Sequence, residues 1–138
     1  MNYCELKAAG DQTYTAFDAK VSISDYEETF NVVDGEAAGR SKMRGHMIRD
    51  PLGCFIGHKI SFFRGDSVEG FDALWDWLKI HSVDDSVWIR AADGQTAIEY
   101  EAYYTSGGRK LESVHNGVNY WGPITVNFIP IDPQIEPI

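Results

Sequence analysis

The stretch "DSVEGFDALWDWLKIHS", from Asp66 to Ser82, predicts the one strong helix of the chain. Four apolar residues recur at the i, i+3, i+4, i+7 spacing of a buried helical stripe: Phe71, Leu74, Trp75 and Leu78. Asp66 is in position to cap the helix, and a glutamate three residues later approximates a capping box. We therefore expect a helix over about residues 67–81.

The apolar stripe of this helix needs an apolar surface to lie on. Val68 and Trp77 flank the stripe and widen it, and the rest of the chain offers only strands as partners. The helix is therefore expected to cover a sheet or the open mouth of a barrel. Trp75 and Trp77 are the residues expected to matter most for this cover.

Strand patterns dominate the chain before the helix. In "AKVSISDYEETFNVV", residues 19–33, apolar residues lie among polar ones, and the alternation slips around Asp25 and Tyr26, which predicts a bulge or bend. Residues 46–65 resume strand character. Five of their side chains share one face by the two-residue period: Cys54, Ile56, His58, Ile60 and Phe62.

The strand pattern returns after the helix. Asp93-Gly94 lies between two β-rich runs and predicts a hairpin, and "HNG" at 115–117 predicts another turn. A last strand should point three apolar residues inward: Ile124, Val126 and Phe128. Three prolines follow and are expected to stop the ladder, leaving an extended tail at about 130–138. The chain of 138 residues suits a single domain, a β-sandwich or split barrel with one flanking helix.

The segment "DGEAAGRSKMRG", from Asp34 to Gly45, has three glycines, three basic residues and almost nothing to bury. It predicts a long exposed loop or hairpin arm at about 34–45. Four cations gather in and beside this arm: Arg40, Lys42, Arg44 and Arg49. A basic arm on an acidic body suits self-association, and the alternative is an exposed loop of mixed charge.

The totals exclude several classes of protein. A net charge of −9 repels phosphate backbones, so we expect no sequence-specific binding of nucleic acid. The start of the sequence shows no secretory signal, and no window approaches a membrane span. Cys4 and Cys54 fit no metal spacing and are expected to be reduced thiols, although a bridge between them stays open.

The residues favour none of three kinds of chemistry: nucleophilic catalysis, metal binding and phosphate binding. Cys54 and His58 share a strand face, but their apolar neighbours favour a buried, inert cysteine and a core or interface histidine over a nucleophile pair. The acidic clusters at 25–28 and 84–85 do not follow calcium-loop spacing, and the glycines of the arm lack G-K-[ST]. We expect no catalytic residue, no metal and no cofactor.

The order of these segments resembles phage and prophage tail proteins of the distal-tail and tail-tube type. The segments that carry the resemblance are "VSISDYEETFNVVDGEAAGR", "GHMIRDPLGCFIGHKISFF", "FDALWDWL", "IEYEAYY" and "NYWGPITVNFIPIDP", from about Val21 to Pro133. In particular, the chain resembles small prophage proteins encoded among the tail genes of gut Firmicutes. Distal tail proteins commonly carry a second domain that this sequence lacks, which favours a tube or minor tail component.

The resemblance implies a non-enzymatic virion structural protein. In that family the sheets of several subunits, often six, join into a ring around a channel, and a long hairpin or loop reaches the neighbour. The matching arm here would be Asp34 to Gly45. The expected partners are further copies of the chain and other tail proteins, with the virion tail as location and the host cytoplasm during assembly. The alternative is a monomeric ligand-binding β-barrel whose helix closes the mouth.

Overall fold

The computed structural model describes residues 4–15, 19–21, 26–34, 39–40, 47–64 and 67–136. The strands before the helix are β1 (Cys4–Ala8), β2 (Ala19–Val21), β3 (Glu27–Asp34), β4 (Gly39–Arg40), β5 (Met47–Ile48) and β6 (Pro51–Arg64). The helix α1 (Val68–His81) is followed by β7 (Val87–Asp93), β8 (Thr96–Tyr103), β9 (Gly107–Gly108), β10 (Leu111–His115), β11 (Val118–Trp121) and β12 (Ile124–Pro130). The expected mainly β fold with one helix is confirmed.

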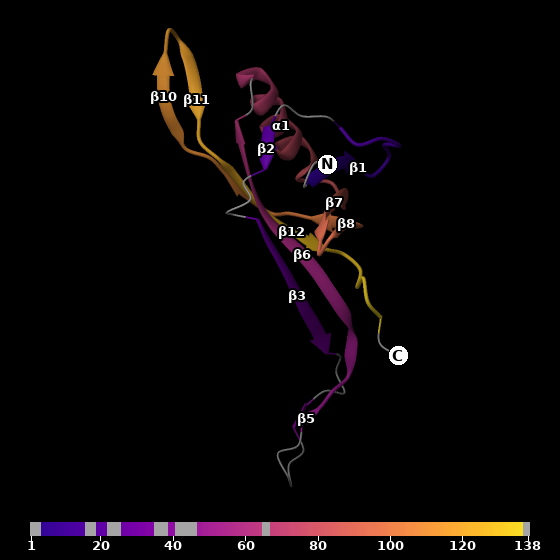
Figure 1. Cartoon of the computed structure of the whole chain (residues 1–138). Coiled ribbons are helices and arrows are strands. Elements are labelled where there is room, and N and C mark those ends of the chain that lie inside the picture. The colour runs from indigo at the N-terminus through magenta and orange to yellow at the C-terminus, as the bar shows by residue number, and fades with distance from the viewer. Residues whose placement is uncertain are drawn as a thin grey trace.

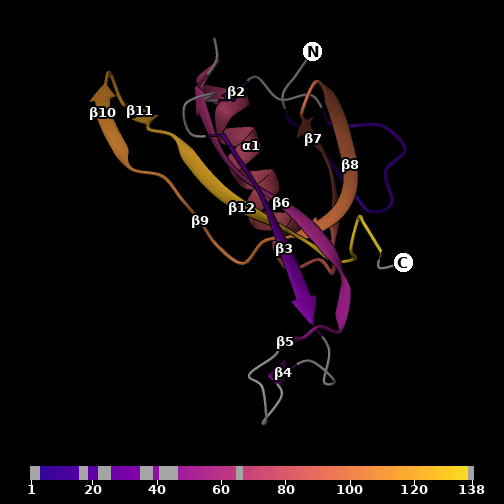
Figure 2. The ribbon, with the colours of Figure 1, turned by 60° about the horizontal axis from the view of Figure 1, so that its bottom comes forward.

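One large antiparallel sheet forms the body, in the order β1-β7-β8-β12-β6-β2, with β3 also paired to β6 and β9 to β12. Strand β12 connects the two halves of this sheet. Its residues 124–128 pair with β6, whereas Ile129 and Pro130 pair with Tyr103 and Ala102 of β8. The two layers expected of a sandwich or split barrel are therefore parts of one bent sheet. Figure 2 shows α1 alongside β6 and β12, with β8 curving past it.

The core lies where the bent sheet and the helix meet. Its fully buried side chains come from both halves of the sheet and from α1, and the largest are Phe71, Phe128, Leu6, Ile60, Leu74 and Ile89. The inward direction predicted for Ile124, Val126 and Phe128 is confirmed. Burying apolar side chains stabilises the fold by about 1.5–3 kcal/mol each, which makes this cluster the main favourable term.

The helix begins and ends close to the predicted positions. Ser67, rather than the expected Asp66, is the N-cap, and its side chain accepts a hydrogen bond from the Gly70 N–H. Phe71, Leu74 and Leu78 are buried as the stripe required. Beyond the stripe, the Tyr104 hydroxyl donates to the Leu78 carbonyl at 2.7 Å, which ties the last turn of the helix to the sheet.

The turn residues explain the hairpins. Gly94 has φ 61 as the first residue of the β7–β8 loop, the place where a type II′ turn requires glycine. Asn116 and Gly117 have φ 50 and 77 between β10 and β11, as a type I′ turn requires. Both predicted turns are confirmed. The bend expected at Asp25 lies outside the described residues.

Candidate assembly surface

The β3–β6 ribbon projects from the core (Figure 1), and several of its apolar side chains are exposed. Strand β3 pairs along its whole length with the first half of β6 and with no other described strand. Residues 27–33 are all exposed, and Phe30 keeps 76% of its surface in solvent. Val32, Val33 and Leu52 are exposed beside it. An eight-residue edge strand of this kind presents unpaired backbone groups next to apolar side chains.

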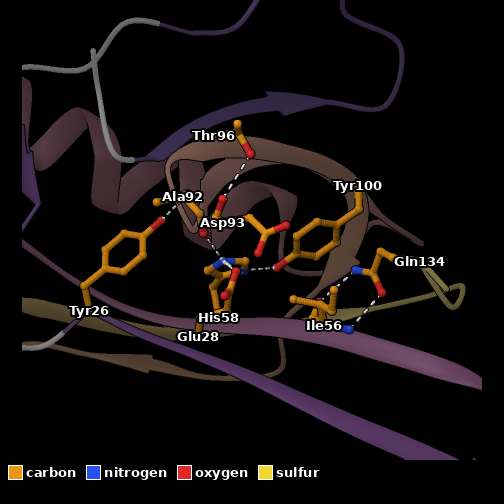
Figure 3. A network of polar contacts seen from close by, with 9 residues as sticks. All are labelled: Tyr26, Glu28, Ile56, His58, Ala92, Asp93, Thr96, Tyr100 and Gln134. Atoms are coloured by element: carbon orange, nitrogen blue, oxygen red, sulfur yellow. Dashed lines mark hydrogen bonds and ion pairs between the residues drawn. The ribbon is translucent and has the colours of Figure 1, made fainter.

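A buried polar network holds the base of this ribbon against the β7–β8 hairpin (Figure 3). His58 of β6 has no exposed surface. Its Nε2 lies 2.9 Å from the Ala92 carbonyl and 3.1 Å from the Glu28 carboxylate, both acceptors, so Nε2 carries the proton. The Tyr100 hydroxyl then donates to Nδ1 at 2.6 Å. His58 is thus a core histidine with both ring nitrogens engaged.

Tyr26 adds a second link between the ribbon and the hairpin. Its hydroxyl accepts a hydrogen bond from the Ala92 N–H at 2.7 Å, and its ring lies edge-on to His58 with centroids 5.9 Å apart. Burial raises the pKa of Tyr26 to about 12. Burial also raises the pKa of Tyr100. The ribbon therefore leaves the core from a rigid base rather than from a loop.

The structure describes the positions of two of the four cations predicted to form the contact, Arg40 and Arg49. Arg40 lies in β4, which pairs with β5 through Arg40 and Met47, so this part of the arm is a hairpin. Arg49 donates through Nε to both carboxylate oxygens of Asp34, at 3.0 and 3.1 Å. The Asp50 N–H also donates to Asp34, at 3.2 Å. Arg49 therefore clamps the base of the arm. Lys42 and Arg44 lie outside the described residues.

A second ribbon, the β10–β11 hairpin, projects at the other end of the molecule (Figure 1). Arg109 anchors it, because its guanidinium lies 4.8 Å from the Trp75 ring and 4.4 Å from the Trp121 ring. The same guanidinium donates to Asp72 at 2.8 Å. Leu111, Val114 and Val118 are exposed on the hairpin. Sequence patterns did not indicate this contact, because nothing around Arg109 distinguishes it from a turn cation.

The two tryptophans expected to matter for the helix cover have different surroundings. Trp75 packs partly buried against the core and against Arg109. Trp77 also packs against the core, and its ring lies 4.6 Å from the His81 ring. Trp75 thus joins α1 to the second ribbon, a role that its place in the helical stripe could not reveal.

The cysteines, His58 and the acidic clusters have contacts that differ from those of a catalytic or metal site. Cys4 and Cys54 are both free, and burial raises the pKa of the Cys4 thiol. The polar contacts of the His58 ring go to Tyr100, Glu28 and Ala92. Among the described residues, His, Cys, Asp and Glu form no group of three that could hold a metal ion. Asp84 pairs with His81 at 2.6 Å.

Two hollows lie beside these surfaces. One, of about 220 Å³, is lined by residues of the ribbon, the β7–β8 turn and the last segment: Glu28, Thr29, Phe30, Cys54, Ile56, Asp93 and Ile135. The other, of about 210 Å³, lies between α1 and the segment after β8, and Trp75, Leu78, Tyr104 and Gly107 are among its lining residues. Both are small beside typical ligand sites of about 300–1,000 Å³.

Comparisons of the chain with protein-family models, curated sequences and solved structures found no match. Within the part of the chain that the structure describes, no helix has the length and hydrophobicity needed to cross a membrane.

Proposed function

We propose that the chain is a non-enzymatic structural component of a phage or prophage tail, which assembles with further copies into oligomeric rings. The observation that carries this proposal is the β3–β6 ribbon, with Phe30 76% exposed on an edge strand. Soluble proteins usually protect such strands with Lys, Pro or a cover, and larger exposed apolar patches mark interaction sites. A partner that covers the ribbon would remove the exposed edge strand and its apolar side chains from solvent.

The placement of the two ribbons favours rings. They project from opposite ends of one core, and each carries exposed apolar side chains (Figures 1 and 2). When one end of a molecule contacts the other end of its neighbour, the contact is heterologous. Such a contact builds a ring when the rotation between neighbours closes, and an open filament when it does not. This is the geometry that the resemblance to tail-tube and distal-tail proteins implies.

The charge of the chain also supports a tail conduit. A net charge of −9 gives the assembled surface a repulsion for the phosphate backbone. DNA passing through a ring of such subunits would meet few binding contacts. The expected location is therefore the virion tail, with the bacterial cytoplasm as the place of assembly and other tail proteins as further partners.

The alternative function, a monomeric ligand-binding barrel, receives less support from the described residues. It requires an apolar cavity under the helix, and the hollow next to α1 is about 210 Å³. A larger depression of about 580 Å³ is lined by small, acidic and hydroxyl residues with Val83, and has no aromatic lining. Ligand pockets are usually lined with hydrophobic and aromatic side chains.

The arm provides the test of assembly. We expect the combined change Arg40→Ala, Lys42→Ala and Arg44→Ala to leave the fold intact and to reduce the mass of the oligomer. The measurement is light scattering behind size exclusion at high protein concentration and two salt concentrations, with negative-stain images of the parent protein to look for annuli. The matched control removes three other cations that lie away from both ribbons, in β1, α1 and β7: Lys7→Ala, Lys79→Ala and Arg90→Ala.

The outcomes separate the two functions. If the parent protein forms annuli and only the arm variant loses them, the tail assignment and its arm are supported. A variant that assembles as well as the parent would show that the arm is not the contact. A parent that remains monomeric at every concentration would contradict self-assembly.

A further inference from the structure

The segment after β12 returns to the ribbon and pairs with the edge of β6. Strand β12 runs beside β6 only as far as Phe128, then diverges to pair with β8. Farther along, the Cys54 N–H donates to the Ile135 carbonyl at 2.7 Å, and the Ile135 N–H donates back at 3.3 Å. The Gln134 N–H also donates to the Cys54 carbonyl, at 3.1 Å. The extended tail expected from about residue 130 is therefore held in place.

The side chain of Gln134 makes the two hydrogen bonds that a main-chain peptide group would make. Its Nε2 donates to the Ile56 carbonyl at 2.7 Å, and its Oε1 accepts from the Ile56 N–H at 2.8 Å (Figure 3). A neighbouring strand would supply the same donor and acceptor to Ile56. A carboxamide carries a donor and an acceptor side by side, as this pairing requires.

The glycine beside this edge makes room for a proline. Gly53 has φ 143, a conformation that side chains rarely adopt. A Cβ on Gly53 would lie 2.4 Å from the Pro133 Cβ and 2.9 Å from the Ile135 carbonyl oxygen. Any larger residue would therefore push the segment away from β6. The edge is shaped for three successive residues: Pro133 in the glycine notch, Gln134 on Ile56 and Ile135 on Cys54.

These contacts define a strand-acceptor site on β6, made by residues 53–56, for an extended peptide of sequence Pro-Gln-Ile. Main-chain hydrogen bonds supply the binding, and the notch and the carboxamide supply the selectivity, as in other β-augmentation sites. The site lies on the projecting ribbon rather than in the core. A segment from another molecule can therefore reach it.

We propose that, in the assembled state, this site binds residues 133–135 of a second copy of the chain. The segment contributes little to its own core, since Ile131 is 38% exposed and Ile135 57% exposed. A neighbour's segment would make the same contacts as the chain's own, so the hydrogen bonds of the two arrangements are equal. The tether favours the chain's own segment in the free monomer, and a neighbour held beside the site in the assembly competes at a similarly high effective concentration. The inference rests on the proposed self-assembly and adds an exchanged strand to it.

A disulfide trap distinguishes the two arrangements. Cys54 and Ile135 are a hydrogen-bonded antiparallel pair, whose Cα atoms lie about 5.5 Å apart, within the range that a disulfide spans. One chain, in the Cys4→Ser background, keeps Cys54. A second, tagged chain combines Cys4→Ser, Cys54→Ser and Ile135→Cys. Neither chain is able to close a disulfide within itself at this site.

The two chains are mixed, concentrated, oxidised and separated on a non-reducing gel. We expect a covalent pair that joins the tagged and the untagged chain in the oligomer fraction. Adding Gln134→Ala to the tagged chain should reduce this product by about tenfold or more, because two hydrogen bonds are lost. Ile131→Cys in place of Ile135→Cys is the matched control, since residue 131 does not face Cys54.

Three results would overturn the exchange. Oligomers without the mixed cross-link would contradict the exchange and leave ring assembly intact, provided that Cys54 and Ile135→Cys in one chain close an internal disulfide. The absence of oligomers would remove the proposed function and the exchange together. A mixed cross-link that Gln134→Ala does not weaken would show that the chains meet by another contact.

Discussion

At the scale of single residues, the described chain uses two tyrosines, one buried and one partly buried, and a buried histidine to join surfaces that are far apart in sequence. Tyr26 and Tyr100 both contact the His58 ring, and both hydroxyls take part in hydrogen bonds at 2.6–2.7 Å. Buried polar groups of this kind stabilise only while each partner is present. The base of the ribbon should therefore respond to the ionisation of its tyrosines.

This response predicts a loss of stability at alkaline pH. The pKa of Tyr26 rises from 10.0 to about 12 on burial, so the unfolded chain releases this proton earlier than the folded chain. The stability that the protonated Tyr26 hydroxyl contributes is complete below pH 10.0 and is lost as the pH rises toward 12. Urea titrations at several pH values should show a falling free energy of unfolding over this window.

A matched variant assigns part of this loss to Tyr26. In Tyr26→Phe the free energy of unfolding should be lower at neutral pH, since the Ala92 N–H loses its acceptor, and should fall less steeply above pH 10.0. Tyr103→Phe, at a 39% exposed position, is the control. A slope equal to that of the parent would show that Tyr26 does not keep its proton in the folded state.

At the scale of elements, α1 and the β10–β11 hairpin depend on one cation. Arg109 is only 9% exposed and lies between two tryptophans while it pairs with Asp72. A guanidinium stacks on aromatic faces through its plane, whereas an ammonium group is a point charge with stronger hydration. The hairpin is therefore held to the helix by shape as well as by charge.

Arg109→Lys tests this attachment. The change keeps the charge beside Asp72 and removes the planar stacking, so the free energy of unfolding should fall by about 1 kcal/mol. Tryptophan fluorescence during urea unfolding reports it directly, because Trp75 and Trp121 make the contact. Lys110→Ala, at the exposed next position, should behave like the parent. Equal stability of Arg109→Lys and the parent would contradict the stacking.

At the scale of the whole molecule, apolar residues divide into those that serve the fold and those left for a partner. Phe128 is completely buried, whereas Phe30 is 76% exposed at the middle of an edge strand. Both lie on strands paired with β6, so their strand position alone does not separate them. The difference is that β12 runs through the core and β3 leaves it.

Phe30→Thr measures what the exposed face of the ribbon contributes to folding stability and to assembly. The free energy of unfolding should change by no more than about 0.5 kcal/mol, because little surface is buried in the isolated chain. The oligomer should dissociate at higher protein concentration than the parent oligomer does. Val83→Thr, at a residue 87% exposed after the helix, is the control for general surface polarity. Unchanged assembly would exclude the ribbon face as the contact.

Sequence patterns alone predicted the helix, the two hairpin turns and the inward face of the last strand. Each depends on neighbours within a few residues: an i, i+3, i+4 stripe, an Asp-Gly pair, an Asn-Gly pair or a two-residue alternation. Such signals are local and act in every fold that contains the segment. The acidic balance and the basic arm were also visible, although Arg49 proved to be a clamp on Asp34.

Only the tertiary structure determines which buried faces pack against each other. His58 and Glu28 are 30 residues apart, and Gln134 and Ile56 are 78 apart. Periodicity shows that a side chain faces inward but not what lies opposite, because the partner is set by how the sheet bends. The β6 edge is an acceptor for Pro-Gln-Ile for the same reason: β12 diverges from β6 after Phe128, and the segment that follows returns to pair at Cys54.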